Sequence, residues 1–268
     1  MLSLNRFALC VLVLSAIVAL SLRADAAQTL PYTADFEPPV YTLDQTVDGV
    51  DGWAAADPTS ATVQGAVRYE KQAALALTSG GAVDQAFDSS DAIVWIDGYY
   101  RGQPTDEVPD LSELTSGSAI VAFTATSGVL CLDGAGDGSG GEWVPTGIAI
   151  DPAKWYRVSL KLDFTTHSYD CYVNGVAITS CQDLGFLYDT TNNLNGFRAA
   201  TGSSPSYLDY LHVSLADPPG VPGSVQEIVD YLVKRSSPAD VRGLDANNDG
   251  IIDAADIASR MLDLAAGS

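Results

Sequence analysis

Between residues 28 and 215, short apolar runs alternate with clusters of glycine, asparagine, aspartate, proline and serine, and helical periodicity is absent. Runs of this length and spacing are typical of β-strands joined by turns. The clearest runs cover residues 92–99, 118–126, 129–132, 143–150, 155–164, 168–173, 176–181, 196–200 and 207–215. So many strands over about 190 residues exceed what one open sheet usually holds. The sequence therefore predicts an all-β domain, built as a two-sheet sandwich with its own core.

One turn in this pattern is specific enough to predict a register. Asn174 and Gly175 stand between two apolar runs, and this dipeptide favours the type I′ turn, whose twist matches that of paired strands. A two-residue turn places Cys171 opposite Ile178. The sequence therefore predicts a β-hairpin here.

The N-terminal segment, residues 1–26, has the composition of a secretory signal peptide. Arg6 precedes an apolar run over residues 7–22, and Ala24 and Ala26 provide a small-residue cleavage site. The run is shorter than the about 20 residues of a membrane span; an uncleaved anchor is the alternative. We therefore expect a secreted mature protein, extracellular, periplasmic or at the cell surface, with no membrane segment after cleavage.

A second change of pattern divides the rest of the chain. Residues 216–223 are rich in proline and glycine and end the strand pattern, so they are expected to form a linker. Ser224 and Glu227 then match a helix capping box. Apolar residues at positions 225, 228, 229 and 232 have helical spacing. The expected domains are therefore the sandwich at residues 27–215 and a small helical module at residues 224–268.

The helical module contains a calcium-loop pattern over residues 245–256. Oxygen ligands stand at loop positions 1, 3, 5, 9 and 12, position 7 supplies a backbone carbonyl, and Gly250 stands at the sharp turn of position 6. The expected ligands are Asp245, Asn247, Asp249, Ile251, Asp253 and Asp256. This spacing predicts a Ca²⁺ site, and apolar residues at positions 257, 261 and 264 predict a helix after it. An acidic linker with accidental spacing is the alternative.

The loop resembles the EF-hand-like calcium repeat of type I dockerins. Asn at loop position 3, Ile at position 8 and Asp at positions 9 and 12 carry the resemblance, which runs from Asp245 to about Leu264. Dockerins attach polysaccharide-degrading enzymes to cohesin-bearing scaffolds, so the resemblance implies a cohesin-like partner. Dockerins normally carry this unit twice and one copy is found here, which weakens the implication.

The β domain resembles concanavalin A-like and laminin G-like jelly rolls. The passages W-Y-R-V at 155–158 and Y-D-C-Y-V-N-G at 169–175 match their central strands. The passages D-F-E at 35–37 and Y-L-D-Y-L-H-V at 207–213 match their first and last strands. The resemblance implies a jelly-roll sandwich with a second calcium site at Glu37 and Asp209. The alternative is that these two residues are surface acids at strand edges.

Three cysteines, Cys131, Cys171 and Cys181, remain after the expected cleavage. They allow one disulfide and leave one thiol over, and export to an oxidising compartment favours such a bond. The predicted turn does not place Cys171 directly opposite Cys181. The pair therefore stays open, either between these two or between Cys131 and one of them.

The formal net charge of the chain is −21. Binding to nucleic-acid phosphates requires clusters of lysine and arginine, so nucleic acid is excluded as an expected partner. Such acidity suits an exported protein that lives with calcium or other cations, which relieve the repulsion between carboxylates.

Sugar recognition on a jelly roll requires aromatic platforms and a few polar groups at loop ends. Tyr100, Trp143 and Tyr188 border polar or glycine-rich turns and are the candidate ligand-binding residues. Core packing is the alternative for each of them. Trp95 and Trp155 stand in apolar runs, and we expect both to pack in the core.

Catalysis has less support, and no catalytic residue is assigned. Glycosidases that resemble this fold carry paired acids as Glu-x-Asp-x-x-Glu, a spacing that the chain lacks. The acids Asp106, Glu107, Asp110 and Glu113 stand in an insertion that we expect to be a solvated loop, although two of them could act as an acid-base pair.

The sequence as a whole predicts a secreted, calcium-binding, lectin-like protein with a docking or stabilising tail. Its expected partner is a polysaccharide, another glycan or a cell-surface molecule. One alternative is a polysaccharide hydrolase or lyase of a dockerin-containing system. The other is a structural module of the cell surface or matrix.

Overall fold

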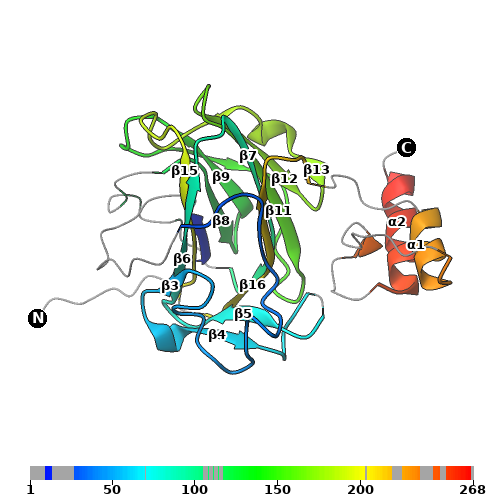
Figure 1. Ribbon diagram of the computed structural model, residues 1–268. Coiled ribbons are helices and arrows are strands. Elements are labelled where there is room, and N and C mark those ends of the chain that lie inside the picture. Colours follow the sequence, from blue (N-terminus) through cyan, green and yellow to red (C-terminus); the bar gives the residue numbers. More distant parts are fainter. Residues whose placement is uncertain are drawn as a thin grey trace, which may run out of the picture.

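In the computed structural model two antiparallel β-sheets pack face to face, and a small helical tail follows them (Figure 1). The structure describes residues 10–13, 27–69, 71–104, 108, 111, 114, 117–202, 204–218, 225–235, 244–247 and 252–266. No described helix is long and apolar enough to cross a membrane. The predicted all-β sandwich is confirmed.

The first sheet has seven strands in the order β10-β9-β8-β1-β15-β6-β3. These strands are β1 (Cys10–Val13), β3 (Trp53–Ala55), β6 (Ala82–Ser89), β8 (Ile120–Thr124), β9 (Gly128–Gly134), β10 (Gly141–Pro145) and β15 (Leu194–Ala200). β1 belongs to the segment that the sequence predicts to be a signal peptide, and it pairs with both β8 and β15. The observed sheet therefore includes four residues that cleavage would remove. The rest of residues 1–26 lies outside the described residues.

The second sheet has nine strands, ordered β13-β12-β11-β7-β16-β5-β4, with β14 paired to β12 and β2 paired to β16. These strands are β2 (Tyr32–Ala34), β4 (Ala61–Gln64), β5 (Ala74–Leu77), β7 (Ile93–Gly102), β11 (Tyr156–Asp163), β12 (Ser168–Val173), β13 (Val176–Ala177), β14 (Leu184–Gly185) and β16 (Ser206–Ser214). β12 and β13 form the predicted hairpin. Asn174 and Gly175 have φ values of 52° and 76°, as a type I′ turn requires. The Ile178 N–H donates to the Cys171 carbonyl at 3.1 Å, which confirms the predicted register.

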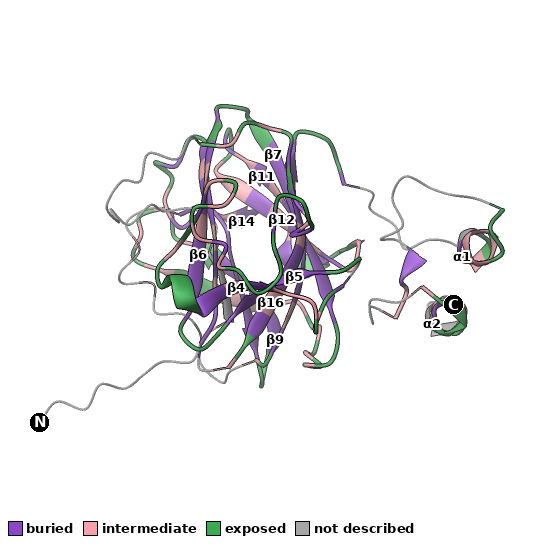
Figure 2. Ribbon diagram, turned by 60° about the horizontal axis from the view of Figure 1, so that its bottom comes forward, coloured by how far each residue is buried: buried purple, intermediate pink, exposed green. Residues whose placement is uncertain are grey.

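Alternation along the strands separates the core from the outer faces. On β11, Val158, Leu160 and Leu162 are buried in the cluster between the sheets, whereas Arg157 and Lys161 occupy the intervening positions. Each buried aliphatic side chain of this kind stabilises the fold by roughly 1.5–3 kcal/mol relative to an exposed one. Figure 2 shows the buried residues following the strands of both sheets, while the connecting loops are largely exposed.

The remaining elements are short helices. They are the 3₁₀ turns η1 (Pro58–Ser60) and η2 (Thr179–Cys181) in the sandwich, and α1 (Val225–Leu232) and α2 (Ala254–Ala266) in the tail. α1 starts where the capping box predicts it, although Ser224 itself lies outside the described residues. Its Ile228 is fully buried, and α1 and α2 pack on each other. The two predicted helices of the tail are therefore present.

Candidate functional site

The outer face of the nine-stranded sheet carries a buried ion pair. Arg157 of β11 donates from Nε to Oδ1 of Asp97 at 2.8 Å and from Nη2 to Oδ2 at 3.0 Å. Asp97 lies on the neighbouring strand β7, and Ser159 donates to its Oδ1 at 2.6 Å. Arg157 is 4% exposed and Asp97 is fully buried. Two parallel hydrogen bonds hold the guanidinium in one orientation, so the pair is a rigid part of this face.

Three aromatic side chains, Tyr69, Tyr99 and Trp155, are buried together in a core cluster separate from the large one between the sheets. Tyr69 stacks on Tyr99 with ring centroids 3.6 Å apart, and Trp155 meets Tyr69 edge-on at 6.1 Å. Tyr99 follows Asp97 by two positions on β7, so both side chains lie on the same face of the sheet. The outer face therefore combines a fixed guanidinium with an aromatic cluster.

The prediction that Trp95 and Trp155 are packing residues is confirmed, although neither belongs to the large cluster between the two sheets. Both side chains are buried, but Trp155 belongs to the outer aromatic cluster. Trp95 packs on Tyr172 with ring centroids 5.4 Å apart. Val94 and Ile96 on either side of Trp95 face the core, so strand alternation turns Trp95 outward.

In the tail, two carboxylates of the predicted calcium loop are buried. Asp245 is 5% exposed and Asp256 is fully buried. Asp256 accepts from the backbone N–H of Asn247 at 3.2 Å and from that of Asp253 at 2.7 Å. Loop positions 3, 9 and 12 are therefore folded onto one another, as a calcium loop requires.

The structure describes four of the six predicted calcium ligands of this loop, Asp245, Asn247, Asp253 and Asp256. The predicted ligands Asp249 and Ile251 lie outside the described residues. Within the described part of the chain, no three side chains of His, Cys, Asp or Glu form a group that could hold a metal ion. Calcium binding by the loop therefore stays a prediction.

A cavity of about 530 Å³ lies between the tail and the outer face of the nine-stranded sheet. Its sandwich wall includes Tyr99, Lys154, Trp155, Arg157 and Asn174, and its tail wall includes Asp245, Asn247, Ser259 and Arg260. Within the described residues, Nε1 of Trp155 and Nε of Arg260 have no hydrogen-bond partner. The cavity thus brings together buried aromatic rings, cationic side chains and two donors that have no partner among the described residues.

The first loop residue also connects the tail to the sandwich. The Tyr69 side chain forms a hydrogen bond with Asp245. Burial, followed by the charges of Tyr99 and Asp245, raises the pKa of Tyr69 well above its ordinary value. The phenol is therefore neutral at physiological pH and donates to the carboxylate.

Sequence reasoning did not identify Asp97, Lys154, Arg157, Asn174 or Arg260 as site residues. One signal was present, because Arg157 occupies an outward position in a strand whose polar and apolar residues alternate. The contribution of Arg260 had no local signal, since it depends on how the tail folds back over residues distant in sequence.

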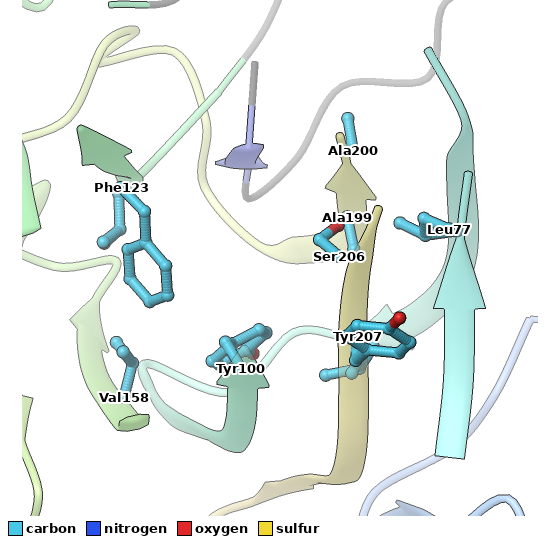
Figure 3. A pocket seen from close by; sticks show the side chains of 10 residues that line it. Leu77, Tyr100, Phe123, Val158, Ala199, Ala200, Ser206 and Tyr207 are labelled. Atoms are coloured by element: carbon cyan, nitrogen blue, oxygen red, sulfur yellow. The ribbon is translucent and has the colours of Figure 1, made fainter. Parts of the chain in front are cut away.

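A second cavity lies inside the sandwich and is too small for a sugar. Its volume is about 20 Å³, and Tyr100, Phe123, Val158 and Ala199 are among the residues around it (Figure 3). A space of this size holds at most about one water, and an apolar lining gives that water few partners. This cavity is a packing gap between the sheets.

The three aromatic residues predicted to bind a ligand have different positions. Tyr100 is 6% exposed and belongs to the core, so its assignment as an exposed platform is wrong. Tyr99 and Tyr100 are consecutive on a strand and must point to opposite faces. Trp143 and Tyr188 are half-buried and pack against a small cluster on the other sheet. The Tyr188 hydroxyl donates to the Leu114 carbonyl at 2.6 Å, so its polar end is already engaged.

The alternative assignment of Glu37 and Asp209 as surface acids is wrong, because both are buried. Glu37 accepts from the backbone N–H groups of Gln72 and Ala73, each at 2.8 Å. Asp209 accepts from the backbone N–H of Tyr69 at 2.9 Å. The two carboxylates therefore hold one segment that covers the outer face. Calcium binding by them stays a prediction.

Two further predictions concern cysteines and acids. Cys131, Cys171 and Cys181 are buried, free thiols in this structure. The acids Asp106, Glu107, Asp110 and Glu113 lie outside the described residues. The structure therefore does not test whether two of these acids could act as an acid-base pair.

No family model matches the chain, and no curated protein shows significant sequence similarity to it. Among solved structures, a sialidase is 10% identical, with a TM-score of 0.46 over 70% of this chain and 20% of the other. The binding domain of Paraclostridial Mosquitocidal Protein 1 is 12% identical, with a TM-score of 0.42 over 60% of this chain and 43% of the other. Domain 4 of AbnA, an extracellular arabinanase from Geobacillus stearothermophilus in complex with arabinotriose, is 11% identical, with a TM-score of 0.37 over 64% of this chain and 79% of that domain. The chain thus spans less than half the length of the first two proteins, and all three likenesses are distant.

Proposed function

We propose that this chain is a secreted, calcium-binding, lectin-like protein that binds a glycan between its sandwich and its tail. The observation that carries the proposal is the cavity of about 530 Å³, because ligand pockets of roughly 300–1,000 Å³ typically combine apolar walls with a few oriented polar groups. Secretion is supported by the composition of residues 1–26.

The cavity wall has the chemistry that a sugar needs. Val176, which is 56% exposed, supplies apolar surface for the C–H face of a sugar ring, while the rings of Tyr99 and Trp155 line the cavity but are themselves buried. Lys154 and Asn174 supply polar groups for hydroxyl or carboxylate oxygens. The free indole N–H of Trp155 is a buried donor, and such a donor gains most from a ligand acceptor.

The tail would bind calcium through its loop. Asp256 is fully buried, and its partners within the described residues are backbone N–H groups. A buried carboxylate is costly unless a counter-charge is near, and each carboxylate oxygen retains lone pairs for a cation. Asp245, Asn247, Asp253 and Asp256 would supply oxygen ligands together with Asp249 and the Ile251 carbonyl. Bound calcium would stabilise the loop that forms the tail wall of the cavity.

Docking of the tail to a cohesin-like partner is part of the same proposal. Val233, Met261 and Leu262 on the tail are 54%, 59% and 71% exposed. Apolar side chains of this size are candidates for an interaction surface that a protein partner would cover.

The glycan site is tested by retention on insoluble polysaccharides. Lys154→Ala removes a cation from the cavity wall, and we expect binding to weaken by about 10- to 100-fold, since a hydrogen bond to a charged group contributes about 1.5–3 kcal/mol. Val176→Trp fills the cavity from an exposed hairpin position and should weaken binding more. Lys161→Ala, on the outer face of β11 but outside the cavity wall, is the matched control and should bind normally.

Trp143→Ala tests which face of the sandwich binds the glycan. Trp143 packs on the opposite sheet, so its replacement should leave retention unchanged. If this variant loses binding while Lys154→Ala keeps it, the glycan lies on the seven-stranded sheet and the cavity assignment is wrong.

A structural module is the second candidate function, and one observation favours it. Tyr100 is buried and Tyr188 is tied to Leu114, so two of the three aromatic residues predicted from the sequence are not free platforms. Absence of retention on every polysaccharide, with the fold intact, would favour this role.

A further inference from the structure

Two basic side chains on the walls of the cavity have no counter-charge among the described residues. Lys154 lies on the sandwich wall, just before β11, and Arg260 lies on the tail wall, within α2. In the described part of the chain, neither side chain forms an ion pair or a hydrogen bond with another residue. Acidic residues outnumber basic ones by 34 to 13 in the whole chain, so a shortage of acids does not explain this.

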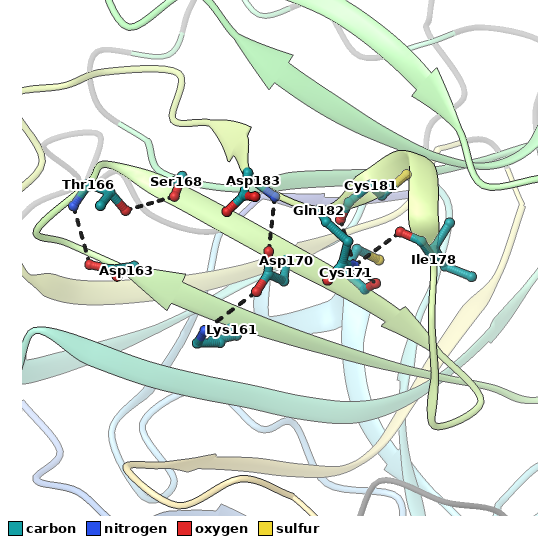
Figure 4. A network of polar contacts seen from close by, with 10 residues as sticks. All are labelled: Lys161, Asp163, Thr166, Ser168, Asp170, Cys171, Ile178, Cys181, Gln182 and Asp183. Atoms are coloured by element: carbon teal, nitrogen blue, oxygen red, sulfur yellow. Dashed lines mark hydrogen bonds and ion pairs between the residues drawn. The ribbon is translucent and has the colours of Figure 1, made fainter.

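The other basic side chains of the described sandwich all have partners. Arg157 pairs with Asp97, Lys71 with Asp35, Arg198 with Asp84, and Lys161 with Asp170, while Arg68 and Arg101 donate to backbone carbonyls. Figure 4 shows the pairing of Lys161 with Asp170. Among the sandwich residues that the structure describes, Lys154 is therefore the basic side chain left for a ligand.

The acids closest to these two cations have other roles. Oδ1 of Asp151 accepts from the backbone N–H of Ala153 at 2.9 Å, so this carboxylate caps the turn before Lys154. Asp245 is the one carboxylate among the described residues that line the cavity, and it is 5% exposed. It is also an expected calcium ligand, and a bound ion would compensate its charge.

The walls also offer more hydrogen-bond donors than acceptors. Nε of Arg260 is buried and has no acceptor in the described residues, and a buried charged donor of this kind is costly until it is hydrogen-bonded. Oδ1 of Asn174 accepts from the Arg157 N–H at 3.0 Å, which leaves the amide NH₂ of Asn174 as a donor. The cavity therefore lacks acceptor oxygens and negative charge, and a ligand would have to supply both.

We propose that the glycan bound in this cavity is anionic, and that its carboxylate or sulfate oxygens are the missing counter-charges of Lys154 and Arg260. This inference rests on the glycan site proposed above and names the class of sugar. The planar guanidinium can form two parallel hydrogen bonds to one oxyanion, whereas the lysine ammonium acts as a point charge.

The net charge of −21 does not prevent such binding. At physiological ionic strength the screening length is about 8 Å, so exposed acids elsewhere on the surface repel the ligand only weakly. Contacts inside the cavity are screened less, because its walls exclude much of the solvent. The two unpaired cations therefore decide which glycans bind.

The test compares polysaccharides that differ only in charge. Uronate polysaccharides are coupled to beads beside their carboxyl-reduced forms, and sulfated galactans beside their desulfated forms. The dissociation constant of the purified protein is measured on each, with calcium present and at physiological ionic strength. We expect at least one charged form to bind about 10- to 100-fold more tightly than its neutral partner. The pair that shows this preference identifies the anion as carboxylate or sulfate.

Lys154→Gln and Arg260→Gln should each weaken binding of the charged form and leave binding of its neutral partner unchanged. A merely structural role would weaken both forms equally, and circular dichroism checks the fold of each variant. Lys161→Gln is the matched control, because it removes the same charge from the outer face of β11 outside the cavity wall. It should keep the full preference for the charged form.

Equal binding of the charged and neutral forms would overturn this inference, while glycan binding itself would stand. A preference that survives in either Lys154→Gln or Arg260→Gln would also overturn it, since the anion would then be bound elsewhere. Absence of binding to every polysaccharide by the folded protein would overturn the proposed function and this inference together.

Discussion

Arg157 lies on the outer face of the nine-stranded sheet and is only 4% exposed, so little water can replace its partner. It forms two hydrogen bonds to Asp97, which also accepts from Ser159. A buried carboxylate that loses its counter-charge is strongly destabilised, typically by about 3–5 kcal/mol.

Arg157→Ala should therefore lower the free energy of unfolding by about 3–5 kcal/mol, measured by urea denaturation. Lys161→Ala is the control, because Lys161 is partly exposed and its nitrogen lies 3.5 Å from Asp170. Breaking such a surface pair costs about 0–1 kcal/mol. Equal losses in the two variants would show that the Arg157–Asp97 pair is not buried as described.

Buried phenols predict how stability changes at high pH. Burial raises the pKa of Tyr32, Tyr41 and Tyr169 above that of a free phenol. The Tyr169 hydroxyl donates to the Leu132 carbonyl at 2.6 Å. Above about pH 10 the unfolded chain loses protons that the folded chain keeps.

Stability should therefore be complete below about pH 10 and fall as the pH rises further, by about 1.4 kcal/mol per pH unit for each such phenol. Urea denaturation between pH 8 and pH 12, with tyrosinate absorbance recorded in parallel, measures this. Tyr32→Phe should make the fall shallower. Tyrosinate absorbance that rises fully before any loss of fold would contradict the burial of these phenols.

At the level of residues, the sequence predicted the strand register that a local turn fixes. It did not predict which of two neighbouring aromatic side chains faces the core. The position of Ile178 opposite Cys171 follows from a two-residue turn alone. The inward position of Tyr100 does not, because Tyr99 and Tyr100 are both aromatic and alternation allows either one to face the core.

At the level of elements, long apolar runs predicted strands well and short ones did not. β12 (Ser168–Val173) matches its predicted bounds, whereas β10 (Gly141–Pro145) ends well before the predicted residue 150. Five strands between residues 32 and 89 were absent from the clearest runs. Of these, β3 (Trp53–Ala55) has three residues and β5 (Ala74–Leu77) has four. Pairing with neighbouring strands, rather than local pattern, stabilises strands of this length.

The calcium loop acts as one element, because its ligands must bind the ion together. Asp245→Ala should abolish calcium binding by the tail in isothermal titration calorimetry and lower its helicity, since removing a charged ligand removes folding energy from a small metal-built module. Asp249→Ala should do the same.

Tyr69→Phe is the control for the Asp245 variant. It removes the hydrogen bond to Asp245 and keeps the ring that stacks on Tyr99, while leaving all the predicted ligands in place. It should therefore retain calcium binding. Normal calcium binding by Asp245→Ala would rule out this residue as a ligand.

At the level of the whole molecule, the candidate site depends on parts of the chain that the sequence could not bring together. Arg157 and Arg260 line one cavity although they belong to the sandwich and the tail. The sequence predicted both modules and the loop between the tail helices, but no local pattern shows that the loop faces the outer sheet. Contacts between distant modules arise from surface complementarity, which periodicity does not record.

This arrangement links calcium to glycan binding. Asp245 and Asn247 are expected ligands of the ion and also line the cavity. Removing calcium should therefore loosen one wall of the glycan site while leaving the sandwich folded.

The most direct measurement is depletion of the purified mature protein from solution by a panel of insoluble polysaccharides, with and without a calcium chelator, while released sugar is assayed in the same tubes. We expect retention on at least one polysaccharide, weaker retention with chelator, and no released sugar. Sugar release would contradict a binding role and indicate an enzyme, and failure of the folded protein to bind any polysaccharide would contradict the lectin-like assignment itself.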